Sequence, residues 1–194
     1  YISIYYDDVH VTGYRVADQK AVEAGENGRV DVTWESPAGE AVLSFGVTLE
    51  GEALLQQLLV RPSVPVETVK VEFRSYIGGP THSDTRYVRT PGGRDTGVRD
   101  PEKAPWAFYA DDFYDQAYGK GKGAGGIMVL PEDWDRVQYG VTGVLEKTVD
   151  LNPGQQKKFH WALWVYPELT NAEAFEAFTE TRTVVKEQLS TFFK

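Results

Sequence analysis

Apolar and polar residues alternate along much of this chain, and a period of two restricts the possible folds more than any other feature. Successive side chains of a β-strand point to opposite faces of a sheet, so alternation is typical of a strand with one buried face. Turn-forming glycines and prolines separate these runs. We therefore predict roughly ten to twelve strands and a mainly β fold, a large antiparallel sandwich of two sheets. The clearest alternating runs are Val30, Val32, Trp34; Leu43, Phe45, Val47, Leu49; Val69, Val71, Phe73; and Phe159, Trp161, Leu163, Val165.

The period changes near the C-terminus. Thr170 and Glu173 have the spacing of a capping box, in which each side chain satisfies a backbone N–H of the other residue. Apolar residues then recur every three or four positions, which predicts one amphipathic helix over residues 171–193. Arg182 interrupts the apolar stripe, so we expect its stem to cover the core and its head to pair with a carboxylate. Many strands followed by one helix suggest a single domain over residues 1–194, with the helix docked on the sheets.

Charge and composition exclude several functions. The chain has 20 basic and 29 acidic residues among 194, a net charge of −9, which disfavours nucleic acid and anionic membranes as partners. No segment has the length and apolarity of a membrane span. The absence of cysteine excludes disulfides, a thiolate nucleophile and a cysteine zinc site.

The N-terminus begins without Met and without the pattern of a signal peptide. We therefore expect a mature form or part of a longer polypeptide. A secreted or periplasmic location is slightly favoured over the cytoplasm.

The stretch from Pro105 to Tyr139 is the best candidate for a site, because aromatic residues and carboxylates alternate there. Exposed rings stack on the C–H faces of sugars while neighbouring carboxylates bind the hydroxyls. The alternative is that these rings pack together beneath the adjacent glycine-rich loop. The residues predicted to bind ligand are Trp106, Tyr109, Asp111, Asp112, Tyr114, Asp115 and Trp134.

The glycine-rich segment Gly119–Gly126 matches neither a P-loop nor a dinucleotide fingerprint, because a strand-like run follows it instead of a helix. We predict a hairpin loop between two neighbouring strands. If the acids on both sides of the loop met at one end, they could bind Ca²⁺, or Asp112 and Glu132 could act as acid and base on a glycosidic bond. Solvated turn acids are the simpler interpretation, and we predict no cofactor.

The three histidines form no metal-binding pattern, since His10, His82 and His160 are far apart and in no HxH or HExxH motif. His160 alternates with the core-facing residues of its strand, so we expect it to point outward. His82 stands beside Asp84 in a loop, which makes it a further weak candidate for a catalytic base.

The strand pattern as a whole, with YADDFYDQAYGKGKGAGGIMVLPEDW and the late strand FHWALWVYPE, resembles galactose-mutarotase-like β-supersandwich domains. Such domains recur in carbohydrate-active bacterial proteins, so the resemblance implies a supersandwich architecture and a sheet that faces a sugar. The catalytic histidines of mutarotases have no counterpart in His10, His82 or His160, so epimerase activity does not follow.

The sequence thus leaves three hypotheses about function. The first is a carbohydrate-binding domain without catalytic activity of its own. The second is an enzyme that acts on polysaccharide, with a carboxylate or His82 as acid or base. The third is a structural or protein-interaction module of a larger protein, in which the aromatic and acidic stretch is simply packed.

Overall fold

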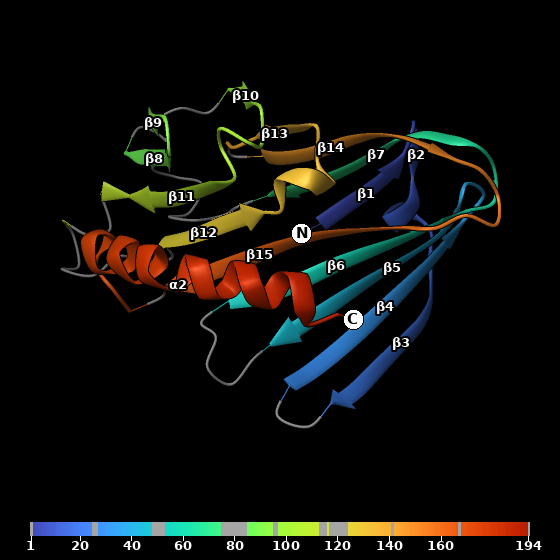
Figure 1. The fold of residues 1–194 in the computed structure, drawn as a ribbon, viewed down its shortest axis with the longest axis horizontal. Coiled ribbons are helices and arrows are strands. Elements are labelled where there is room, and N and C mark those ends of the chain that lie inside the picture. The colour runs from blue at the N-terminus through green and yellow to red at the C-terminus, as the bar shows by residue number, and fades with distance from the viewer. Residues whose placement is uncertain are drawn as a thin grey trace.

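The computed structural model describes residues 2–24, 27–47, 53–74, 85–94, 97–112, 116, 124–140, 142–166 and 168–193. Their strands form two antiparallel sheets (Figure 1). The smaller sheet has the spatial order β10 (Val98–Arg99), β13 (Arg136–Gln138), β14 (Thr142–Leu151), β7 (Val66–Arg74), β1 (Ile2–Tyr6) and β2 (Val9–His10). The larger has the order β3 (Arg15–Ala24), β4 (Asn27–Ser36), β5 (Gly39–Val47), β6 (Ala53–Pro62), β15 (Lys157–Tyr166), β12 (Ala124–Val129), β11 (Trp106–Asp111), β8 (Arg86–Thr90) and β9 (Gly93–Arg94).

The two sheets pack against each other, and the main hydrophobic core lies between them. Val69 and Val71 of the smaller sheet, and Leu43 and Phe159 of the larger, belong to one buried cluster. These residues come from the alternating runs of the sequence, so alternation marks the face that enters the core, although Val30, Val47 and Val165 of the same runs are exposed. The prediction of a mainly β, two-sheet antiparallel fold is confirmed.

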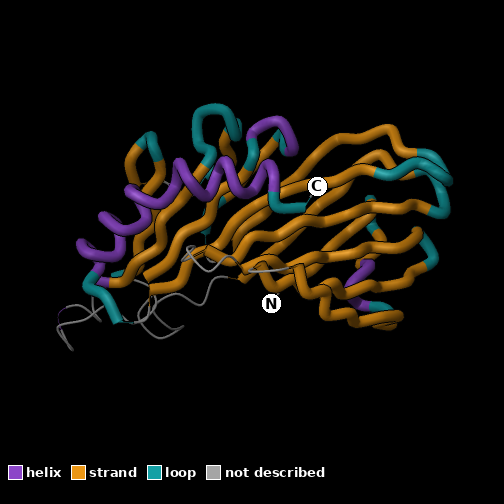
Figure 2. Tube along the Cα trace, turned by 60° about the horizontal axis from the view of Figure 1, so that its bottom comes forward, coloured by secondary structure: helices purple, strands orange, loops and turns teal. Residues whose placement is uncertain are grey.

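Helix α2 (Asn171–Thr191) covers the opposite face of the larger sheet, over β6, β15, β12 and β11 (Figure 1, Figure 2). Its N-terminus has the predicted capping box: Glu173 N–H donates to Thr170 Oγ1, and Thr170 N–H donates to the Glu173 carboxylate. Phe178, Val185 and Leu189 are buried beneath it in a second core. Among the described residues, no helix has the length and apolarity needed to cross a membrane.

The expected carboxylate partner of Arg182 is not found, because no ion pair involves this residue within the described part of the chain. Its guanidinium lies instead over the ring of Trp106, 4.4 Å from the centroid, and 5.3 Å from that of Phe178. Arg182 therefore covers the second core with its charged group on an aromatic face, an arrangement that the π-electrons of the ring stabilise. Desolvation in this position lowers the pKa of the guanidinium.

Candidate functional site

Trp106, Tyr109 and Trp134, the described aromatic residues of the predicted site, are packing residues in this structure. Tyr109 and Trp134 are each 2% exposed and belong to the core between the sheets. Trp106 is half-buried on the other face of β11, beneath Phe175 and Phe178 of α2. The expectation that Tyr109 and Trp134 offer ring faces to a ligand is therefore corrected, because both faces of this part of the sheet are covered.

Two of the predicted carboxylates hold the hairpin and the helix in place. Asp111 is 3% exposed and accepts a hydrogen bond from the hydroxyl of Thr85. Asp112 accepts from Asn171 Nδ2 at 3.4 Å, at the first turn of α2, where a negative charge is favourable. Both contacts give these residues a structural role. His82, Tyr114, Asp115 and the loop residues 117–123 lie outside the described residues.

The acids on the two sides of the glycine-rich segment do not meet. β11 and β12 pair antiparallel, as predicted for a hairpin. Asp112 follows the end of β11 beside the loop, whereas Glu132 follows the far end of β12. A six-residue strand is roughly 20 Å long. Among the described acids, Asp112 and Glu132 therefore lie at opposite ends of the hairpin, too far apart to act together on one glycosidic bond. Among the described residues, no group of three His, Cys, Asp or Glu side chains is close enough to hold a metal ion.

A row of polar residues crosses the outer face of the larger sheet, on the side that carries α2. Direct cross-strand pairs link neighbouring members: Lys20 with Asp31, Asp31 with Ser44, Ser44 with Gln57, and Gln57 with His160. We call these five residues the polar row. Ser44 is 3% and Gln57 5% exposed, so both are polar groups held almost out of bulk water. Burying such polar groups costs free energy unless they make hydrogen bonds.

An open pocket of about 650 Å³, the outer groove, lies over the polar row beside the C-terminal end of α2. Two ion pairs line it, Arg29 with Asp31 and Arg61 with Glu40, with N–O distances of 2.7 and 2.6 Å. Arg29 donates through both Nε and Nη2 to the two oxygens of Asp31. These hydrogen bonds raise the pKa of Arg29 and lower that of the Asp31 carboxyl, to which Ser44 also donates.

Apolar side chains supply the remaining surface of the outer groove. Val42 and Leu59 contribute from β5 and β6, and Phe193 contributes from the segment that follows α2. Lys158 Nζ donates to the backbone oxygen of Phe193 at 3.4 Å, which fixes this end of the chain against the sheet. Apolar patches among convergent polar groups are the usual composition of a small-molecule site.

His160 links the polar row to the turn Pro131–Asp133. Asp133 Oδ2 accepts from both the backbone N–H of His160 at 2.8 Å and its Nδ1 at 2.7 Å. On the other side of the ring, Gln57 Nε2 lies 3.0 Å from His160 Nε2. As predicted, His160 points away from the core between the sheets. Its neighbours Asp133 and Gln57 could not be predicted from the sequence, because each is on a different element.

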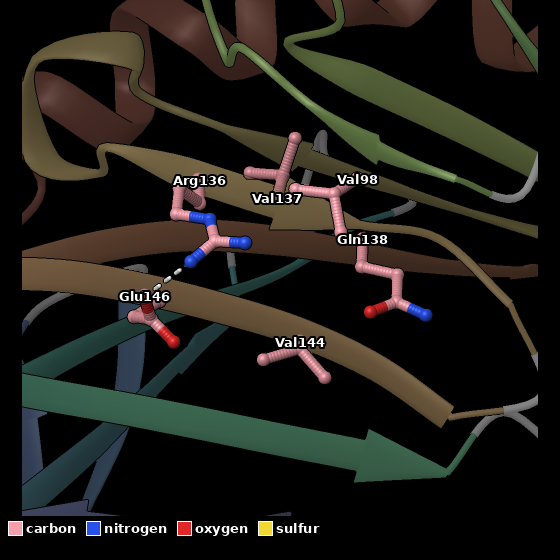
Figure 3. A pocket seen from close by; sticks show the side chains of 6 residues that line it. All are labelled: Val98, Arg136, Val137, Gln138, Val144 and Glu146. Atoms are coloured by element: carbon pink, nitrogen blue, oxygen red, sulfur yellow. Dashed lines mark hydrogen bonds and ion pairs between the residues drawn. The ribbon is translucent and has the colours of Figure 1, made fainter.

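Another pocket, much smaller than the outer groove, lies on the smaller sheet (Figure 3). Arg136 and Glu146 cross it as an ion pair at 3.4 Å, with Gln138 and Val144 beside them. Its volume of about 50 Å³ has space for little more than water, so it is no rival to the outer groove as a ligand site.

Comparison with known proteins identifies the fold. No protein-family model and no curated protein matches the chain. An α-N-acetylgalactosaminidase from Bifidobacterium bifidum is similar in structure, with 9% identity, a TM-score of 0.57, and coverage of 96% of this chain and 33% of its own. Heparan sulfate lyase HepC from Pedobacter heparinus has 10% identity, a TM-score of 0.52, and coverage of 87% and 24%.

A galactose mutarotase related enzyme from Lactobacillus acidophilus also matches, with 12% identity and a TM-score of 0.40 over 79% of this chain and 72% of its own. That score is too low to carry an argument. The chain spans about a quarter to a third of the length of the other two proteins. Mutarotase-like proteins are among the matched structures, as the predicted resemblance to galactose-mutarotase-like β-supersandwich domains implies. At identities of 9–10%, the similarity of the other two proteins shows the fold alone.

Proposed function

We propose that this chain is a carbohydrate-binding β-sandwich domain, not catalytic on its own, whose ligand lies in the outer groove. The observation that carries the proposal is the polar row, in which the nearly buried Ser44 and Gln57 stand beneath an open pocket of about 650 Å³. The matched proteins described as a galactosaminidase and a heparan sulfate lyase support a carbohydrate ligand. The fold by itself does not transfer their activities.

The charges around the outer groove favour a neutral glycan. Its lining contains four acidic residues, Asp18, Asp31, Glu35 and Glu40, and four basic ones, Lys20, Arg29, Arg61 and Lys158. These charges balance and the chain as a whole has a net charge of −9, so this face offers an anionic chain no excess of positive charge. Paired ions with hydroxyl and amide groups between them match the donors and acceptors of sugar hydroxyls.

The test is isothermal titration of the protein with a panel of neutral oligosaccharides and with sulfated and uronic-acid oligosaccharides. Tryptophan fluorescence is a weak probe, because no tryptophan lines the outer groove. The double variant Arg61→Ala with Glu40→Ala removes one ion pair without changing net charge. We expect it to weaken neutral-glycan binding roughly tenfold, the value of one charge-assisted hydrogen bond.

A matched control is the double variant Arg136→Ala with Glu146→Ala, which removes the ion pair of the small pocket (Figure 3). Both pairs are largely exposed, so each costs at most about 1 kcal/mol of stability. The control should bind as the parent does. Absence of binding across the whole panel by folded protein, or equal weakening in both double variants, would refute the proposal.

One observation favours a second candidate, a structural or protein-interaction module. The described aromatic residues of the stretch Pro105–Tyr139 are packed against α2 and the core, as that hypothesis predicts. A folded protein with flat titrations against every glycan would support this candidate over the first.

A further inference from the structure

The chain of contacts from Asp133 through His160 to Gln57 fixes the direction of every hydrogen bond in it. An ionised carboxylate only accepts, and Asp133 Oδ2 takes both the backbone N–H and the Nδ1 of His160. Nδ1 must therefore carry a proton. In the neutral imidazole, Nε2 then has a lone pair and accepts.

The partner of His160 Nε2 must be a donor, and the only donor on the Gln57 side chain is its NH₂ group. Gln57 is thereby oriented with its nitrogen toward the histidine. Its carbonyl oxygen is left for the outer groove, which Gln57 lines. Among the described residues, no hydrogen bond is made to Gln57 Oε1.

The surroundings hold this arrangement in place. The His160 side chain is 18% and the Asp133 side chain 15% exposed, and the ring of Phe193 lies 6.3 Å from the imidazole. Without these contacts, an amide in a sheet can rotate to present either its oxygen or its nitrogen. With them, the amide oxygen of Gln57 is a fixed acceptor on the floor of the outer groove.

We propose that Gln57 determines specificity in the outer groove by accepting a hydrogen bond from one hydroxyl of the glycan, and that Asp133 and His160 are positioning residues for its amide. The proposal rests on the function proposed above, since the ligand it assigns to Gln57 is a sugar hydroxyl. Its structural half, the orientation of the amide, is independent of any ligand.

The structural half is tested by NMR on the unliganded parent protein. We expect the imidazole ¹⁵N signals of His160 to show a protonated Nδ1 and an unprotonated Nε2, with one amide proton of Gln57 shifted by its bond to the ring. A protonated Nε2, with or without a proton on Nδ1, would overturn the proposal, because Nε2 would then donate and require the amide oxygen of Gln57 as its partner. This readout stays valid whether or not any glycan binds.

The functional half is tested with a neutral glycan that binds and with its set of monodeoxy analogues. For the parent protein, one analogue should bind roughly two- to tenfold more weakly than the intact glycan, the range expected of one hydrogen bond. In Gln57→Leu this difference in affinity should vanish, because the affinity for the intact glycan falls by the same factor. His160→Leu frees the amide of Gln57 to rotate. It should therefore reduce the affinity difference between the intact glycan and that one analogue, and leave the differences for the other analogues unchanged.

His10→Leu is the matched control, because His10 lies on the smaller sheet against Tyr5 and should leave all affinities unchanged. A histidine that merely supported the fold would lower the affinity for every analogue alike, and that result would refute the positioning role. If no glycan binds, the proposed function and the role of Gln57 toward a hydroxyl both fail, and the NMR result alone decides the orientation. If glycans bind but discrimination is unchanged in Gln57→Leu, only this further inference fails.

Discussion

Gly126 is the residue whose replacement tests most directly how α2 docks on the sheet. It lies on β12 between Phe108 of β11 and Trp164 of β15, its direct cross-strand partners. The missing side chain leaves a slot into which Phe178 of α2 inserts, with its ring 5.7 Å from that of Phe108 and 5.0 Å from that of Trp164. A Cβ on residue 126 would stand 2.6 Å from Phe178 Cδ2 and closer still to Cε2, well inside ordinary contact.

We expect Gly126→Ala to lower the free energy of unfolding by about 1–3 kcal/mol, the usual cost of adding a methyl group to a filled core. Phe178 is fully buried, and its ring must retreat by about 1 Å against Trp106 and Trp164, which cannot yield freely. For a chain of this length, a loss of about 2 kcal/mol lowers the melting temperature by roughly 4–8 °C. Urea unfolding followed by circular dichroism and calorimetry measure the two quantities.

Two further variants make the reasoning refutable. Gly28→Ala adds the same methyl group to β4, where nothing lies within 4 Å of the new Cβ, so it should be neutral or slightly stabilising. Phe178→Leu removes the ring that occupies the slot, and in that background Gly126→Ala should cost close to nothing. An equal loss with and without the ring, or a loss in Gly28→Ala as large as in Gly126→Ala, would show that the slot is not the cause.

Three other changes have outcomes that the structure predicts. Thr170→Ala removes the capping box and should lower stability by about 1 kcal/mol, as measured by urea unfolding. The hydrogen bonds from the side chain and the backbone N–H of Thr170 lower the pKa of Glu173, so its contribution is complete above the ordinary glutamate pKa and disappears as the pH falls through the lowered value. Thr170→Ala keeps the backbone N–H, so this part of the acid dependence of unfolding should become smaller. Burial raises the pKa of Tyr6, Tyr109 and Tyr139. Their contribution to the free energy of unfolding should therefore be complete below a pH of about 10 and decrease above it. In an absorbance titration, these tyrosines should ionise only as the protein unfolds.

Local periodicity was sufficient to predict the two-sheet fold and the helix. A period of two shows which side of a strand is apolar, and Thr170 with Glu173 marks where the helix begins. These signals depend on residues only a few positions apart, and the structure confirms them. Whether a second face of a strand is also covered depends on what packs over it, and alternation alone does not contain that information.

The error over the aromatic stretch follows from this limit. β11 and β12 are buried on both faces, between the smaller sheet on one side and α2 on the other. Tyr109 therefore lies in one core and Phe108 in the other. The signal was present in the sequence, because WAFYA and GGIMVL are continuous apolar runs without alternation, which is typical of a strand covered on both faces. A strand of that kind cannot offer every other ring to a ligand.

The outer groove could not be found from the sequence for a different reason. Asp31, Ser44 and Gln57 are ordinary outward-facing residues of three strands, and none belongs to a motif. They become one row only through the register of β4, β5 and β6, and a shift of a single residue in any pairing would turn that strand's member to the opposite face. His160 joins the row through β15 and brings Asp133 with it. The polar row therefore depends on the registers of four strand pairs at once. It exists only in the folded sheet, so no local pattern of the sequence could reveal it.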